Sequence, residues 1–135
     1  MANHVYDSFI DLRGTGDIDL AGDPVRAVLI DLGSYTFSAA HSHLSDVPSG
    51  ARVATAVVSG SSFSGGVFDC ANLTWPLVAT GSTVSAVIFY KETGTDSLSP
   101  LICYIDGATG LPFATDGGDV NADINTGGIL KDTWP

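Results

Sequence analysis

Residues 82–106 read STVSAVIFYKETGTDSLSPLICYID, two apolar runs joined by a polar loop. Residues 84–90 are rich in Val, Ile, Phe and Tyr, which suit a pleated and packed surface, and residues 101–105 form a second run of this kind. The connecting residues 91–100 have the composition of turns and loops. Because neither run alternates with polar residues, both faces of each strand are expected to be covered. The stretch predicts a β-hairpin with a wide exposed loop at the centre of the core.

Strict alternation along a strand also predicts which side chains share a face. In the second run of the hairpin, it places Leu101, Cys103 and Ile105 on one face. Ile102 and Tyr104 are then expected to point to the opposite face.

Outside the hairpin, the chain reads as further short strands separated by turn residues. Residues 119–125, DVNADIN, alternate strictly and predict a half-buried strand with a polar outer face. Residues 34–48 have little periodicity and predict a long loop with a helical turn near residues 38–44. Residues 60–66 and 107–118 are also expected to be loops. The predicted strands outside the hairpin are residues 25–32, 51–59, 67–69, 71–75, 119–125 and 127–130.

The beginning of the chain predicts a short amphipathic helix over residues 3–12. Val5, Phe9 and Leu12 follow the i, i+4, i+7 spacing of one helix face. An asparagine at the start and a glycine shortly after the end are suitable start and stop signals.

A chain of 135 residues is one domain's worth, and we find no linker or internal repeat in it. We therefore predict one β-domain over residues 1–135, with an N-terminal helical segment at 1–14 and a β-core at 25–131. Many short strands separated by turn signals are typical of an all-β sandwich or barrel.

The charge balance is strongly acidic, because 15 Asp and Glu face 5 Lys and Arg, a formal net charge of −10. The basic residues are scattered and form no cluster that could follow phosphates, so binding to nucleic acid or to an anionic membrane is not expected. Charged residues are only 15% of the chain, against about 25% in an average protein. This low fraction favours a protein largely covered by partners, or a compact β-domain with Ser and Thr at its surface.

The N-terminal sequence has no signal-peptide pattern, and no apolar run approaches the ~20 residues of a membrane span. The protein is therefore expected to fold in the cytosol. Cys70 and Cys103 lie in apolar strand candidates, so we expect reduced and buried thiols, with a disulfide between them as the alternative.

Several patterns resemble functional motifs without completing them. His41 and His43, with Asp46 nearby, are the best metal candidates, but no further ligand has a convincing spacing. Residues 119–123 resemble the opening of a calcium loop but lack its later Gly and Glu, and residues 60–64 lack the final Gly of a nucleophile elbow. We therefore expect no catalytic residues, metal or cofactor. A cell-wall hydrolase that uses Asp and His is the alternative.

Five stretches together carry a resemblance to a known family. They are AVLIDLGSYTFSAAHSHLSDV at 27–47, GARVATA at 50–56, GGVFDCANLTWP at 65–76, AVIFYKETGTDSLSPLICYID at 86–106 and GGDVNADINTGGILK at 117–131. The chain resembles a family of small structural proteins of tailed bacteriophages over nearly its whole length, including the MANH start. The matching positions are Tyr35, His43, Ser45, Asp46, Gly66, Phe68, Asp69, Tyr90, Lys91, Gly94, Pro100, Ile105, Asp106, Gly128, Ile129 and Lys131.

Such proteins are similar to head decoration, or cement, proteins. The resemblance implies a jelly-roll-like domain that binds the outer capsid surface of the virion and bridges subunits of the major capsid protein. It also implies a homodimer or homotrimer, assembled in the host cytoplasm, with no catalytic residues. The alternative is a component of the tail or of the head–tail connector, including a receptor-binding module that uses loops near Tyr35 and at residues 107–118.

We expect two contact elements whose apolar residues flank the β-core rather than belong to it. One is the N-terminal segment with Val5, Tyr6 and Phe9, and the other is the arm at residues 41–48. The alternative is that Val5 and Phe9 cover an open end of the barrel. The full set of candidate interface residues is Val5, Tyr6, Phe9, Tyr35, His41, His43 and Leu44.

Overall fold

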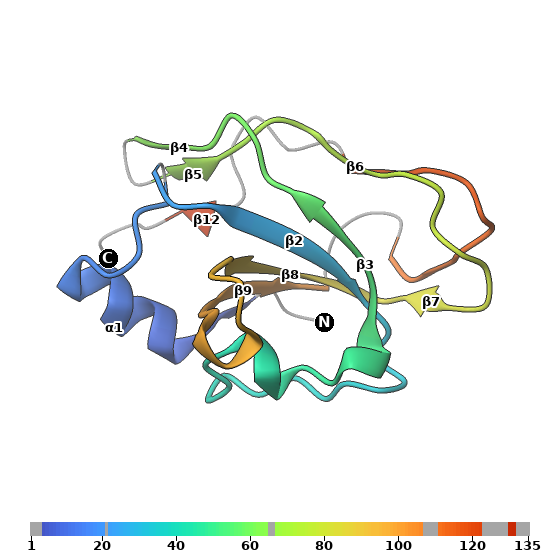
Figure 1. The fold of residues 1–135 in the computed structure, drawn as a ribbon, viewed down its shortest axis with the longest axis horizontal. Coiled ribbons are helices and arrows are strands. Elements are labelled where there is room, and N and C mark those ends of the chain that lie inside the picture. Colours follow the sequence, from blue (N-terminus) through green and yellow to red (C-terminus); the bar gives the residue numbers. More distant parts are fainter. Residues whose placement is uncertain (1–3, 21, 65–66, 107–110, 123–129, 132–135) are drawn as a thin grey trace.

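The computed structural model describes residues 4–20, 22–64, 67–106, 111–122 and 130–131. In these ranges the chain forms antiparallel β-sheets and one short α-helix (Figure 1), which confirms the predicted all-β class.

The largest sheet has five strands in the order β1-β9-β8-β2-β3, all antiparallel. The pairing of the predicted hairpin is confirmed, because β8 and β9 are neighbours and β8 occupies the centre of the sheet, but the first strand begins at Ala86 rather than at Val84, which pairs with Phe113 in another sheet. The strands are β1 (His4–Val5), β9 (Leu101–Ile105), β8 (Ala86–Lys91), β2 (Val25–Ile30) and β3 (Arg52–Val57).

Three small sheets form a second layer over one face of this sheet, as Figure 1 shows for β4, β5 and β6. They pair β12 with β5 and β4, β11 with β6, and β10 with β7. Their strands are β4 (Ser62–Ser64), β5 (Val67–Asp69), β6 (Leu73–Trp75), β7 (Thr83–Val84), β10 (Phe113–Ala114), β11 (Val120–Ala122) and β12 (Leu130–Lys131).

A first core cluster fills the space between these two layers. Phe68 of β5 meets Phe89 of β8 edge to face, with ring centroids 6.4 Å apart. The indole N–H of Trp75, which is buried, donates to the carbonyl oxygen of Ala27 at 3.1 Å. The fold is therefore β-sandwich-like, with one continuous layer and one divided layer.

The other face of the large sheet is covered by loops and single helical turns (Figure 1). The loop at residues 31–51 contains the 3-10 turns η1 (Leu44–Asp46) and η2 (Ser49–Ala51), and η3 (Asp96–Leu98) lies in the β8–β9 loop. A second core cluster beneath them includes Ile30 and Ile88, both fully buried. Burial of the hairpin on both faces is thus confirmed.

The N-terminal prediction is wrong in its boundaries. The helix, α1, runs from Asp7 to Thr15 rather than over residues 3–12. His4 and Val5 are extended because they pair with Tyr104 and Cys103 of β9. The sheet edge thus offers this segment hydrogen bonds that delay the start of the helix.

Strict alternation fails in β9 because the pairing with β8 contains a bulge. Phe89 lies opposite Cys103 and Tyr90 lies opposite Leu101, so Ile102 is an extra residue. Ile102 and Cys103 consequently both pack in the first core cluster, whereas Leu101 packs in the second with Tyr104, so the alternating assignments of Leu101 and Ile102 are wrong.

The remaining boundaries differ in smaller ways. Residues 60–66 contain strand β4, and residues 107–118 contain β10, although both were predicted as loops. The alternating strand at 119–125 is confirmed over β11, and its last residues lie outside the described ones, as do 127–129 of the final predicted strand. Both cysteines are free and buried, as predicted.

Candidate interaction surface

The N-terminal segment lies beside the loop that leads into the arm, although more than 25 residues separate the two in the chain. The backbone N–H of Asp7 donates to the carbonyl oxygen of Ala39 at 3.1 Å. The hydroxyl groups of Tyr6 and Tyr35 are 3.0 Å apart. The N-terminal segment and the loop at residues 31–51 therefore form one continuous surface.

An aromatic cluster joins these two segments to β9. Phe37 is its centre, with ring centroids 4.5 Å from Tyr104, 5.4 Å from Tyr6 and 4.9 Å from His4, on which it stacks. Such pairs add to the stability that burial itself provides, by about 0.5–1.5 kcal/mol each. The aromatic cluster consists of His4, Tyr6, Tyr35, Phe37, His41 and Tyr104.

A chain of hydrogen bonds runs through this cluster from the core outwards. The Tyr6 hydroxyl bonds to that of Tyr35, which lies 2.8 Å from Nδ1 of the half-buried His41. Burial raises the pKa of both tyrosines above the ordinary value, so the hydroxyls remain protonated. These hydrogen bonds hold the loop against the N-terminal segment. They also give the tyrosine hydroxyl groups partners in surroundings that are otherwise apolar.

Asp46 fixes the arm at residues 41–48. Its Oδ2 accepts hydrogen bonds from the backbone N–H groups of Ser42 at 2.9 Å and His43 at 3.2 Å. These two bonds, the Ser42 bond first, lower the pKa of the Asp46 carboxyl group below its ordinary value. The arm is also hydrogen-bonded to the hairpin, because the N–H of Leu44 donates to the carbonyl oxygen of Ser99 at 2.8 Å.

Arg52 of β3 also holds the arm in place through hydrogen bonds. Its guanidinium donates to the carbonyl oxygens of Leu44 at 2.8 Å and Val47 at 2.7 Å, and it pairs with Asp96 at 2.7 Å. One side chain thus connects η1, η3 and the edge of the large sheet. Sequence reasoning treated Arg52 only as a scattered basic residue, since nothing in its neighbourhood signals this role.

The prediction that the candidate interface residues flank the β-core is wrong for four of them, because their side chains are buried. Tyr6 and Phe9 are fully buried, and Tyr35 and Leu44 are each 4% exposed. These four belong to the two core clusters, so their side chains serve the fold itself rather than flank it. Only Val5, His41 and His43 keep part of their side chains at the surface.

The histidines that were weighed as metal ligands have other partners. Nδ1 of His41 bonds to Tyr35, and Nδ1 of His43 lies 2.9 Å from the Ser42 hydroxyl. Within the part of the chain that the structure describes, no group of three or more His, Cys, Asp or Glu could hold a metal ion. The other weighed motifs, residues 60–64 and 119–123, contain strands β4 and β11.

The buried thiols are poorly suited to nucleophilic chemistry. Burial raises the pKa of Cys70 to about 11 and that of Cys103 to about 12. Both groups are therefore protonated near neutral pH, and the thiolate is the nucleophilic form.

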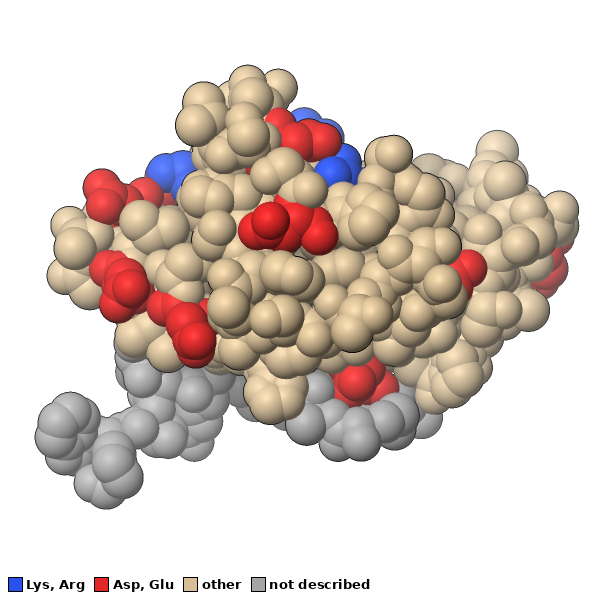
Figure 2. All heavy atoms as spheres, turned by 90° about the horizontal axis from the view of Figure 1, so that it is seen from below, with Lys and Arg blue, Asp and Glu red and all other residues tan. Residues whose placement is uncertain are grey.

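The described basic side chains are all engaged with carboxylates. Arg26 pairs with Glu92 at 3.3 Å, and Lys91 pairs with Asp23 at 3.1 Å, in addition to the Arg52 pair. In Figure 2, which views the molecule from the side of the 31–51 loop, acidic groups are dispersed and basic groups appear only at one margin. This arrangement offers no described basic surface for phosphates.

Comparison with known proteins gives no assignment: no protein-family model matches the chain, and no curated protein sequence matches it. Among the described residues, no helix has the length and apolar character needed to cross a bilayer.

Proposed function

We propose that the chain is a structural protein of a bacteriophage virion, most simply a decoration protein that binds the outer capsid surface and bridges capsid subunits. The proposal rests first on the resemblance that extends over nearly the whole sequence. The jelly-roll-like topology and the homo-oligomeric state implied by that resemblance are part of the proposal.

The observation that carries it is that the described residues behind the resemblance have architectural partners. Asp46 caps the arm, and His43 forms a β-bridge with Pro100 between arm and hairpin. Phe68 and Tyr35 are buried in the two core clusters. Residues that hold loops and layers in place are typical of a structural protein with a fixed surface. Catalytic residues instead meet around one reacting group.

A decoration protein acts through many copies of a modest interface. A stable contact buries on the order of 1,000 Å² or more, and bridging several shell subunits adds the advantage of multivalency. The face of the large sheet that is covered by the loop at residues 31–51 and by η3, here called the loop face, offers a broad surface of this kind, since the arm is held by Asp46, Arg52 and the hairpin.

A deletion experiment tests the function directly. In a phage whose genome encodes this chain, we expect deletion to lower the temperature at which heads release their DNA. Adding the purified protein back should restore that temperature. Heads of unchanged thermal stability, together with a loss of host adsorption, would contradict decoration and favour the tail or receptor-binding alternative.

A further inference from the structure

The turn between β6 and β7 presents the most exposed large apolar side chain of the described residues. Leu77 is 77% exposed and follows Pro76, with a backbone φ of +51°. It is the only non-glycine residue with a positive φ in the described ranges. In this conformation Cβ crowds the following carbonyl oxygen, so Gly or Asn would fit the position at lower cost. Leu77 thus combines backbone strain with an unfavourable exposure of apolar surface.

The turn is firmly held. The backbone N–H of Leu77 donates to Oδ1 of Asp119 at 2.9 Å, and that of Val78 donates to the carbonyl oxygen of Gly118 at 3.0 Å. Val78 is buried in the first core cluster. The leucine side chain is therefore displayed by a rigid frame, which lowers the entropy that binding would cost.

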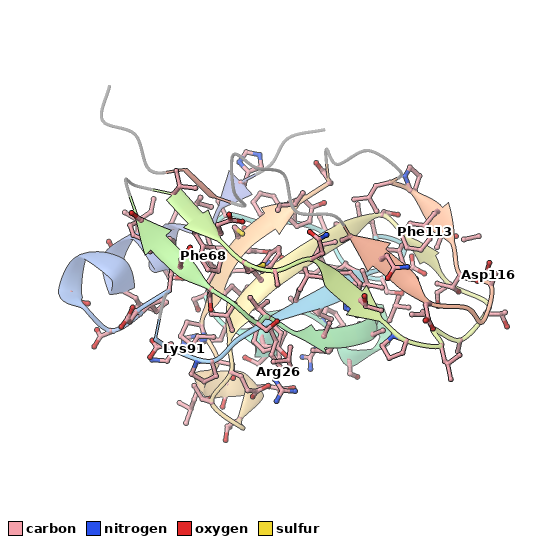
Figure 3. All side chains as sticks on the ribbon, turned by 90° about the horizontal axis from the view of Figure 1, so that it is seen from above. Arg26, Phe68, Lys91, Phe113 and Asp116 are labelled. Atoms are coloured by element: carbon pink, nitrogen blue, oxygen red, sulfur yellow. The ribbon has the colours of Figure 1, made fainter. Side chains whose placement is uncertain are left out.

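Negative charge borders this leucine. Asp119 and Asp116 are both exposed, and Oδ1 of Asp116 accepts the N–H of Gly118 at 2.9 Å. Figure 3 shows Asp116 at the extreme end of the molecule, beyond Phe113 of β10. The basic residues Arg26, Arg52 and Lys91, whose side chains the structure describes, pair with other carboxylates.

These features define the Leu77 tip, an apolar centre with an acidic border. Contact between two such tips would oppose like charges, so a second copy of the chain is a poor occupant. A pocket that is apolar inside and lined with Lys or Arg at its rim is complementary in both respects. The Leu77 tip consists of Pro76, Leu77, Asp116, Gly118 and Asp119.

We propose that the Leu77 tip docks into an apolar pocket with a basic rim on the capsid shell subunit. This inference rests on the proposed function and adds to it the residue that anchors the contact. Strained and exposed residues persist where the surroundings hold them for a purpose, and buried anchors at the centre of an interface supply most of its affinity.

Val57 provides a matched control. It is 65% exposed in β3, at the edge of the large sheet, and its φ is not positive. Its neighbour in β2 is Arg26, which pairs with Glu92, so the charge beside this exposed apolar residue is compensated.

Binding of purified protein to phage heads that lack it tests the inference. Bound copies per head are measured over a concentration series for the wild type, Leu77→Asn, Val57→Thr and the double variant Asp116→Asn with Asp119→Asn. Asparagine tolerates the positive φ, and at positions 116 and 119 it retains an oxygen acceptor for the turn. Thermal unfolding of each free protein verifies that it is folded.

We expect Leu77→Asn to weaken binding about 10-fold or more, because a leucine side chain no longer enters an apolar pocket. Its melting temperature should equal or exceed that of the wild type. Val57→Thr should bind within about two-fold of the wild type, because a surface substitution away from the interface has little effect. The double variant should bind more weakly at low salt and with a smaller salt dependence.

Equal binding of Leu77→Asn and wild type would overturn this inference and leave the proposed function intact. An equal loss for Leu77→Asn and Val57→Thr would also overturn it. If the wild-type protein does not bind heads at all, both the inference and the proposed function fail.

Discussion

Arg52 shows how a single residue organises the loop face. Its side chain is 19% exposed. The carbonyl oxygens of Leu44 and Val47 and the carboxylate of Asp96 accept its hydrogen bonds. We expect Arg52→Ala to lower the free energy of unfolding by about 2–3 kcal/mol, since hydrogen bonds from charged groups are lost and buried carbonyls lose partners. Urea denaturation measures this change.

Arg26 is the matched control for that substitution. It forms one ion pair with Glu92, and its side chain is 42% exposed. Arg26→Ala should therefore cost less than about 1 kcal/mol. Equal losses for the two variants would show that Arg52 acts as an ordinary surface charge.

The tyrosine chain predicts an order of stabilities. Tyr35→Phe removes the group that bonds to both Tyr6 and His41, whereas Tyr6→Phe leaves the bond between Tyr35 and His41 in place. We expect Tyr6→Phe to cost about 1 kcal/mol and Tyr35→Phe to cost more, up to about 3 kcal/mol, because unpaired buried polar groups are expensive. The reverse order in chemical denaturation would contradict this hydrogen-bond chain.

Buried thiols and phenols make stability sensitive to alkaline pH. Burial is the main cause that raises the pKa of Cys70 to about 11 and those of Cys103 and Tyr104 to about 12. Unfolded Cys and Tyr titrate near about 8.5 and 10, so above these values the unfolded state binds fewer protons than the native state. The stability that these raised pKa values contribute should be fully present below about pH 8.5 and should be lost as the pH rises towards 12.

Urea midpoints measured from pH 7 to 11 test this dependence. Cys103→Ala should give a shallower decline than the wild type, because one of the shifted groups is removed. A midpoint that is constant over this range would show that these groups titrate alike in both states.

At the scale of elements, the central strands should be the most stable part of the chain. β8 has neighbours on both sides and core clusters on both faces, whereas β7 and β10 pair only with each other. We therefore expect the slowest amide hydrogen exchange in β8 and β2, and faster exchange in β7 and β10. Equal protection in all strands, measured by NMR, would contradict this layered organisation.

The sequence predicts elements where local pattern and tertiary environment agree. The two apolar runs of the hairpin and the alternating residues of β11 are of this kind. The predicted start of the helix is wrong because His4 and Val5 pair with β9, which lies about 100 residues away in the chain. The bulge at Ile102 is equally invisible, since it depends on the register with β8.

The candidate interaction surface could also be predicted only in part from the sequence. Sequence patterns indicate the N-terminal segment and the arm separately, but their connection through Tyr35, which bonds to Tyr6 and to His41, follows from the sheet order rather than from periodicity. Leu77 was missed because an exposed leucine after a proline has no sequence signature until its φ is known.

For the molecule as a whole, the low charge content and the held loop face favour a protein that functions within an assembly. Charged residues are 15% of the chain, and the described Arg and Lys side chains are neutralised within the fold. The remaining acidic excess would suit a partner surface of basic character.

The copy number of the protein in purified virions tests the central claim most directly. Quantitative mass spectrometry should compare it with the major capsid protein of the same particles. We predict a copy number within a few-fold of the capsid protein, as a shell-covering protein requires. A value of about a dozen or fewer, which rings at the tail would give, or absence from the particles, would contradict a decoration role.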